Sequence, residues 1–147
     1  MSETASYPRL FTIDEANATL SGIKASVEQL LETFREIRGE IQETAARAGL
    51  PVGSPDLPRH LEARGRATQL FERVKQLIDR IHSSGCLVNG PEAGLVDFPC
   101  LYNNEIVFLC WKYGEPRVGH WHRIPDGFAG RRPLLDDSDP GSGDSVH

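Results

Sequence analysis

The 147-residue sequence has no long apolar segment, no dense run of basic residues and only three cysteines. Its longest apolar run, residues 106–111, is far shorter than the roughly 20 residues of a membrane-spanning helix. The net charge is −5, and no segment carries the concentrated positive charge that binds a phosphate backbone or an anionic membrane. We therefore expect neither nucleic acid nor membrane as a partner.

The cysteines indicate a reducing compartment. Cys86, Cys100 and Cys110 are odd in number and include no CxxC pair, and a chain of this length can bury a core without disulfides. The first residues show neither the basic patch nor the apolar core of a signal peptide. We expect reduced thiols and a cytoplasmic localisation.

The first third of the chain has the pattern of one long helix. Thr12-Ile13-Asp14-Glu15 has the form of a capping box, in which the threonine and glutamate side chains satisfy each other's backbone amides. Apolar residues then follow a 3-4 spacing for about five heptads: Ile13, Ala16, Leu20, Ile23, Val27, Leu30, Phe34, Ile37 and Ile41. This pattern predicts a helix over about 12–48 with a coiled-coil-like apolar stripe.

A second amphipathic helix is predicted over about 59–84, after a linker at 49–58 with three prolines and two glycines. The short connection favours an antiparallel helical hairpin over about 12–84. The second helix has a wide apolar face that includes Phe71 and Ile78. Because an exposed apolar strip is unusual in a monomer, we expect a homodimer through the helices.

From Cys86 onwards the apolar period changes to two, with turn signals at Asn103-Asn104 and at 112–116. This predicts a small antiparallel meander of three or four strands over about 86–124, followed by an irregular segment at 125–133. Residues 135–147 are rich in Asp, Ser and Gly and are expected to form a disordered acidic tail. The fold class is therefore α+β, with a helical hairpin and a sheet in one domain over 1–134.

The residues with the most chemical potential lie on the last predicted strands. Alternation puts His120 and His122 on one face of a strand, and pairing Cys110 with Val118 adds Cys110 to that face. The same pairing puts Trp111 and Trp121 together on the opposite face. Cysteine, histidine and carboxylate side chains suit zinc or iron, so the candidate metal ligands are Cys110, His120, His122 and Glu115. Apolar residues share this face, however, and favour a metal-free core.

The segment Gly127-Phe128-Ala129-Gly130-Arg131 is a second candidate site. Its glycines allow backbone amides to converge on an anion, and an arginine can bind a carboxylate or phosphate with two hydrogen bonds. The alternative is structural: a turn at Gly127, an anchor at Phe128, and an ion pair of Arg131 with Asp97 or with a glutamate of the first helix.

Several ordered motifs resemble a known family: Arg9–Asn17, Gly94–Pro99, and the set that runs from Cys110-Trp111 to Arg131. Together they resemble the bacterial proteins grouped as domain of unknown function 2203, over about residues 9–134. The resemblance implies no activity. It implies that the residues that match the motifs serve the common role of the family, namely Asp97, Glu115, Trp121, His122 and Arg131. His120 departs from the family pattern.

Two functional hypotheses follow. The sequence favours a non-catalytic intracellular binding protein without a cofactor, which uses the helical hairpin and the loop near Arg131 to bind an unknown protein or a small anion. The candidate ligand-binding residues are His122, Arg131, Glu115, Asp97 and Trp121. The alternative is a zinc or iron protein, and an enzyme if the metal is catalytic. No catalytic motif is recognisable, so no catalytic residue is assigned.

Overall fold

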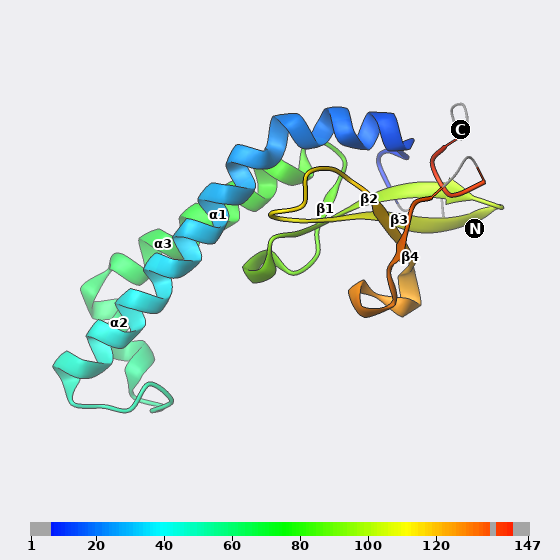
Figure 1. Cartoon of the computed structure of the whole chain (residues 1–147). Helices are drawn as coiled ribbons and strands as arrows, with labels where there is room; N and C mark the ends of the chain where they lie inside the picture. The colour runs from blue at the N-terminus through cyan, green and yellow to red at the C-terminus, as the bar shows by residue number, and fades with distance from the viewer. Residues whose placement is uncertain (1–6, 136–137, 143–147) are drawn as a thin grey trace.

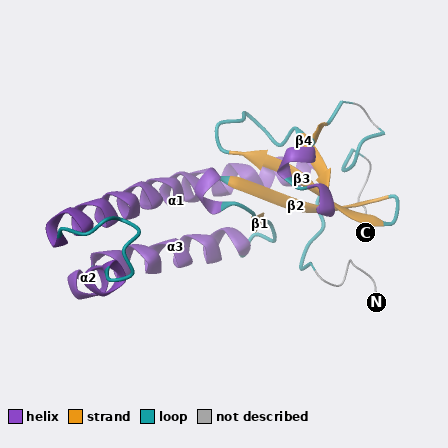
Figure 2. Cartoon of the chain, turned by 90° about the horizontal axis from the view of Figure 1, so that it is seen from below, coloured by secondary structure: helices purple, strands orange, loops and turns teal. Residues whose placement is uncertain are grey.

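A helical hairpin lies beside a five-stranded antiparallel sheet and extends beyond it (Figure 1). The structure is a computed structural model and describes residues 7–135 and 138–142. The helices are α1 (Ile13–Ala48), α2 (Leu57–Arg64) and α3 (Arg66–His82). In Figure 2, α3 runs alongside α1 and the sheet lies at one end of the hairpin. The predicted α+β class is confirmed.

The predicted capping box starts α1. The Glu15 amide donates to Thr12 Oγ1 at 3.2 Å, and the Thr12 amide donates to Glu15 Oε1 at 2.8 Å. These bonds satisfy backbone amides that have no partner within the helix. The helix ends at Gly49, whose φ of 67° is left-handed, and both ends agree closely with the predicted 12–48.

The predicted single helix over 59–84 is wrong, because the chain breaks at Gly65. Gly65 has a φ of 78°, a left-handed conformation that ends α2 before α3 begins. The break leaves Arg64 beside α1, where its Nε donates to Glu40 Oε2 at 2.8 Å. This ion pair ties the short α2 to α1 at the end of the hairpin that is remote from the sheet (Figure 1).

The sheet is a meander with strands in chain order. Its strands are β1 (Leu87–Val88), β2 (Leu95–Tyr102), β3 (Glu105–Lys112), β4 (His120–Arg123) and β5 (Arg132–Pro133). Asn103 and Asn104 form a two-residue turn with φ of 50° and 62°, as a hairpin of this kind requires. The turn fixes the register of β2 against β3 and puts Asp97 opposite Cys110. The short β5 lies where the sequence predicted an irregular segment.

The register expected for β4 is wrong by two residues. Cys110 pairs with His120 and not with Val118. Val118 lies outside the strand because its amide donates to Asn17 Oδ1 of α1, at 2.8 Å. A shift of two residues preserves the faces, so Cys110 still shares its side with the histidines.

One face of the sheet packs against the hairpin and forms the main core. Its sheet residues include Val96, Phe98, Val107, Leu109, Trp111 and Trp121, which meet Leu20, Val27, Leu77 and Ile81 of the helices. Both tryptophans are buried on this face, as the sequence predicted. The opposite face carries Asp97, Cys110 and His122, also buried. Within the described residues, no helix has the length and apolarity needed to cross a membrane.

Part of the C-terminal segment packs on the domain, which differs from the expected disordered tail. Pro140 and Gly141 are buried, and the carbonyl of Gly141 accepts from the amide of Ile13 at 2.9 Å. The hydroxyl of Tyr102 donates to the carbonyl of Ser138 at 3.0 Å. Residues 138–142 therefore cover the N-terminus of α1, while the rest of the expected tail, 136–137 and 143–147, lies outside the described residues.

These contacts predict that the segment contributes to stability. A chain that ends at Leu135 should melt about 2–5 °C below a chain that ends at Ser142, because it loses the hydrogen bonds of Gly141 with Ile13 and of Ser138 with Tyr102, and one buried proline. Thermal unfolding followed by circular dichroism measures the difference. Equal melting temperatures would show that the segment does not hold the helix N-terminus in solution.

Candidate functional site

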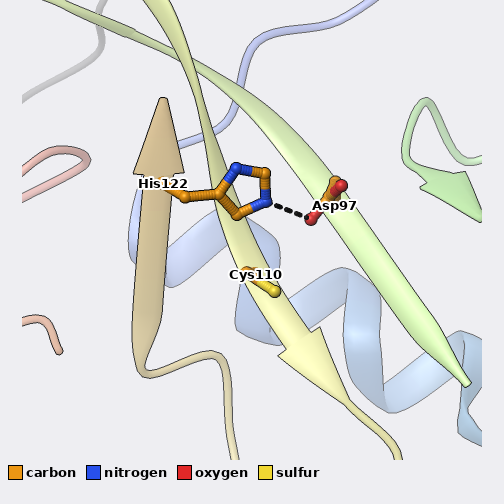
Figure 3. Close-up of side chains that lie close together, drawn as sticks. All are labelled: Asp97, Cys110 and His122. Atoms are coloured by element: carbon orange, nitrogen blue, oxygen red, sulfur yellow. Dashed lines mark hydrogen bonds and ion pairs between the residues drawn. The ribbon is translucent and has the colours of Figure 1, made fainter. Parts of the chain in front are cut away.

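Asp97, Cys110 and His122 converge on the face of the sheet that does not meet the hairpin (Figure 3). They come from three adjacent strands: Asp97 from β2, Cys110 from β3 and His122 from β4. One potential ligand atom from each lies within 4.8 Å of the other two. The exposed fractions are 2% for Asp97, 1% for Cys110 and 2% for His122, so the cluster is shielded from water.

The ring of His122 is oriented by a backbone group. Its Nδ1 lies 2.9 Å from the carbonyl oxygen of Arg123, and because a carbonyl only accepts, Nδ1 carries the hydrogen and donates it. Nε2 then faces Asp97 Oδ1 at 3.3 Å (Figure 3). This is the arrangement of a metal-binding histidine, in which one ring nitrogen is held by a backbone carbonyl and the other faces the ion.

Asp97 is held in the same way. The side-chain amide of Asn89 donates to Asp97 Oδ2 at 2.7 Å, which leaves Oδ1 directed at His122. Two of the three side chains therefore have an outer hydrogen bond that fixes their direction. Such partners keep ligands in position before an ion arrives.

The electrostatics of the metal-free cluster are those of an ion pair. Burial lowers the pKa of His122, but hydrogen bonds with Asp97, Cys110 and the Arg123 carbonyl outweigh it and raise the pKa to about 10. At neutral pH the imidazole is consequently protonated and paired with the Asp97 carboxylate. A divalent ion bound at this cluster would replace this proton at Nε2.

A second group of polar residues lies beside the cluster. The guanidinium of Arg131 donates from Nη1 and Nη2 to both carboxylate oxygens of Glu115, at 3.0 and 2.6 Å. It also stacks over the ring of Phe128, 4.3 Å from the centroid. Burial raises the pKa of Glu115, whereas Arg131 and the Lys112 amide together outweigh this effect and lower it. His120 Nδ1 lies 3.8 Å from Glu115 Oε2.

The structure thus brings together only part of the metal set that the sequence suggested. Cys110 and His122 meet, whereas Glu115 and His120 belong to the group around Arg131. Arg131 pairs with Glu115, not with Asp97 or a helix glutamate. Trp121 packs on the hairpin side and takes no part in either group.

Sequence reasoning missed Asp97 as a partner of Cys110 and His122, although it named the residue as a ligand-binding candidate. The signal is present in the Asn103-Asn104 turn. A two-residue turn fixes the pairing of the strands on either side, and it places Asp97 directly opposite Cys110.

The other two cysteines lack this environment. Burial raises the pKa of Cys86 to about 11 and that of Cys100 to about 12. Both thiols stay protonated at neutral pH and are poor nucleophiles and poor metal ligands. Cys110 is the cysteine with a histidine and a carboxylate beside it.

Comparison with known proteins gives a family but no activity. The sequence profile of the family described as Uncharacterized conserved protein (DUF2203) matches residues 9–134. The chain belongs to this family. No curated protein and no solved structure gives a significant match.

The His122 pair makes the stability of the metal-free protein dependent on pH. Since the pKa of His122 rises from 6.5 in the unfolded chain to about 10 in the fold, its contribution to stability is fully present below pH 6.5 and is lost as pH rises through 10. Between about pH 7 and 9 the free energy of unfolding of the wild type should fall more steeply than that of His122→Gln, by up to about 1.4 kcal/mol per pH unit. Urea unfolding at several pH values in the presence of a chelator measures both slopes, and parallel slopes would exclude the ion pair.

Proposed function

We propose that this protein binds a divalent transition-metal ion, zinc in the first place, through Asp97, Cys110 and His122. The observation that carries the proposal is the convergence of three different ligand types within 4.8 Å in a buried site. Thiolate, imidazole and carboxylate are the three side-chain ligands that zinc uses in proteins. Of the two hypotheses drawn from the sequence, the geometry therefore supports the metal site better, with Asp97 in place of Glu115 and His120.

The outer contacts support the same proposal. Asn89 and the Arg123 carbonyl direct Asp97 Oδ1 and His122 Nε2 toward each other before any ion is bound. Burial also favours a metal, because Asp97 together with a Cys110 thiolate carries two negative charges that a divalent cation neutralises. Three protein ligands leave one of the four zinc positions open, which is the pattern of catalytic rather than structural sites.

The proposal includes a reducing, cytoplasmic location. All three cysteines are free thiols in the structure, and a thiolate ligand requires that Cys110 stay reduced.

Zinc stoichiometry tests the proposal. Protein purified without a polyhistidine tag should hold or take up close to one zinc per chain in elemental analysis after dialysis. Asp97→Asn, Cys110→Ser and His122→Gln should each weaken zinc binding by about tenfold or more, because each removes a ligand.

The matched control is His120→Gln, which changes the neighbouring histidine on the same face of β4 and should retain zinc. Loss of zinc in His120→Gln together with retention in Asp97→Asn would restore the ligand set suggested by the sequence. A wild-type protein that takes up no zinc at all would overturn the proposal.

A second candidate function, interaction through the helical hairpin, is favoured by Phe71. This residue lies on α3 and is 52% exposed, and it borders a hollow lined by Pro58, Leu61, Glu62, Ala67 and Thr68. Ile78 of the expected strip is partly buried against the core, so the proposed contact centres on Phe71. We keep the homodimer as the proposed partner, because two-fold pairing would cover both copies of the ring.

Sedimentation analysis tests this second candidate. The wild type should sediment as a dimer at roughly tens of micromolar, and Phe71→Ser should shift it to a monomer by removing the aromatic contact. Phe128→Ser removes another exposed phenylalanine, which lies under Arg131 and outside the helical hairpin, and should remain dimeric. A monomeric wild type, or a dimer that Phe71→Ser leaves intact, would contradict the proposal.

A further inference from the structure

We propose that the open position of the metal centre takes a carboxylate ligand, and that Arg131 holds this carboxylate. The inference rests on the proposed metal site and adds the chemical class of its ligand. Arg131 lies beside the three proposed metal ligands.

The register of β5 places Arg131 on the same face as the metal ligands. His120 pairs with Pro133 and Trp121 pairs with Arg132. Continuing this antiparallel pairing by one residue places Arg131 opposite His122. Because side chains alternate along a strand, Arg131 lies on the cluster side, whereas Arg132 lies on the other side and stacks on Trp121 at 5.4 Å.

Two contacts fix the guanidinium plane of Arg131. Stacking on Phe128 at 4.3 Å sets the plane, and the two hydrogen bonds to Glu115 set its direction. Arg131 therefore binds the planar carboxylate of Glu115 by donating from both of its terminal nitrogens. The side chains of Arg131 and Glu115 are 18% and 21% exposed, so the pair lies at the border between the buried cluster and solvent.

Glu115 has other partners when a ligand takes Arg131. Its Oε1 already accepts from the Lys112 amide at 2.8 Å, and that bond does not involve the arginine. Its Oε2 lies 3.8 Å from His120 Nδ1, a buried ring nitrogen that has no hydrogen-bond partner among the described residues. A small shift of the carboxylate would pair these two atoms. The exchange thus leaves both carboxylate oxygens of Glu115 with a hydrogen-bond partner, and it frees both terminal nitrogens of Arg131 for a ligand.

The charge of Arg131 favours an anion over water at this place. Asp97 and a Cys110 thiolate would neutralise a divalent ion, and a guanidinium released by Glu115 would lack a counter-charge until a ligand carboxylate restores its ion pair. A ligand carboxylate would accept both hydrogen bonds of Arg131 and would fill the open position of the metal. The chemical class is therefore a small carboxylic acid in its ionised form.

Cobalt(II) in place of zinc makes both metal binding and carboxylate binding visible by absorption spectroscopy. The thiolate-to-cobalt charge-transfer band reports the metal with Cys110, and the ligand-field bands report the fourth position. Acetate is the probe, and acetamide is its neutral control. Acetate should change the ligand-field bands of the wild type and acetamide should not.

Variants at three positions then test the role of Arg131. Arg131→Met should bind cobalt but weaken the acetate response by about tenfold or more, because the charged pair of hydrogen bonds is lost. Arg132→Met, the adjacent arginine on the opposite face, should respond as the wild type does. Glu115→Gln removes the competing carboxylate while keeping an acceptor for the Lys112 amide, so it should bind acetate more tightly than the wild type does.

The outcomes separate the two proposals. A wild type without the charge-transfer band contradicts the metal site itself. A normal charge-transfer band with no acetate response, or with equal acetate affinity in Arg131→Met and wild type, overturns the carboxylate inference alone. If Arg131→Met does not fold, Glu115→Gln decides, and acetate affinity that is unchanged or weaker in this variant overturns the inference.

Discussion

The position of β3 between β2 and β4 determines both halves of the molecule. Alternation along this one strand sends Val107, Leu109 and Trp111 to the helical hairpin and sends Cys110 to the opposite face. The pairing then adds Asp97 from β2 on that face, and His122 follows from β4. A slip of one residue in either pairing would exchange the two faces of a strand, putting polar side chains into the core. The register that builds the apolar core therefore also builds the polar cluster.

A buried carboxylate, thiol and imidazole are costly unless they are paired, and this explains the contacts around them. Asn89 donates a hydrogen bond to one oxygen of Asp97, and the Arg123 carbonyl accepts one from Nδ1 of His122. The remaining atoms, Asp97 Oδ1 and His122 Nε2, then pair with each other. In the metal-free protein a proton on His122 balances the charge of Asp97. A divalent ion would balance both that charge and a Cys110 thiolate. The site is thus a polar interior for which we propose a cation, with Arg131 and Glu115 as a neutral pair at its border.

Local signals in the sequence predict most of the fold. The Thr12–Glu15 capping box and the 3-4 spacing fix α1, because a helix start and a helix face are both properties of short sequence separations. The change to a period of two locates the sheet. The Asn103-Asn104 turn also predicts that Asp97 pairs with Cys110, because a two-residue turn sets the register of the strands on either side.

The left-handed Gly65, by contrast, carries no signal that separates it from Gly22 or Gly39, which α1 includes without a break. The β4 register depends on the bond between Val118 and Asn17, a contact across 101 residues that no local pattern reveals. The ion pair of Arg131 with Glu115 follows from that loop geometry and was equally out of reach.

We propose that Cys110, His122 and Asp97 form one metal-binding site. X-ray absorption at the zinc edge of the zinc-loaded protein tests it most directly, because sulfur and lighter ligands scatter differently. We expect one sulfur at about 2.3 Å and nitrogen or oxygen ligands at about 2.0–2.2 Å. The sulfur signal should vanish in Cys110→Ser and persist in Cys100→Ala. A zinc shell without sulfur in the wild type would exclude Cys110 as a ligand and overturn the site.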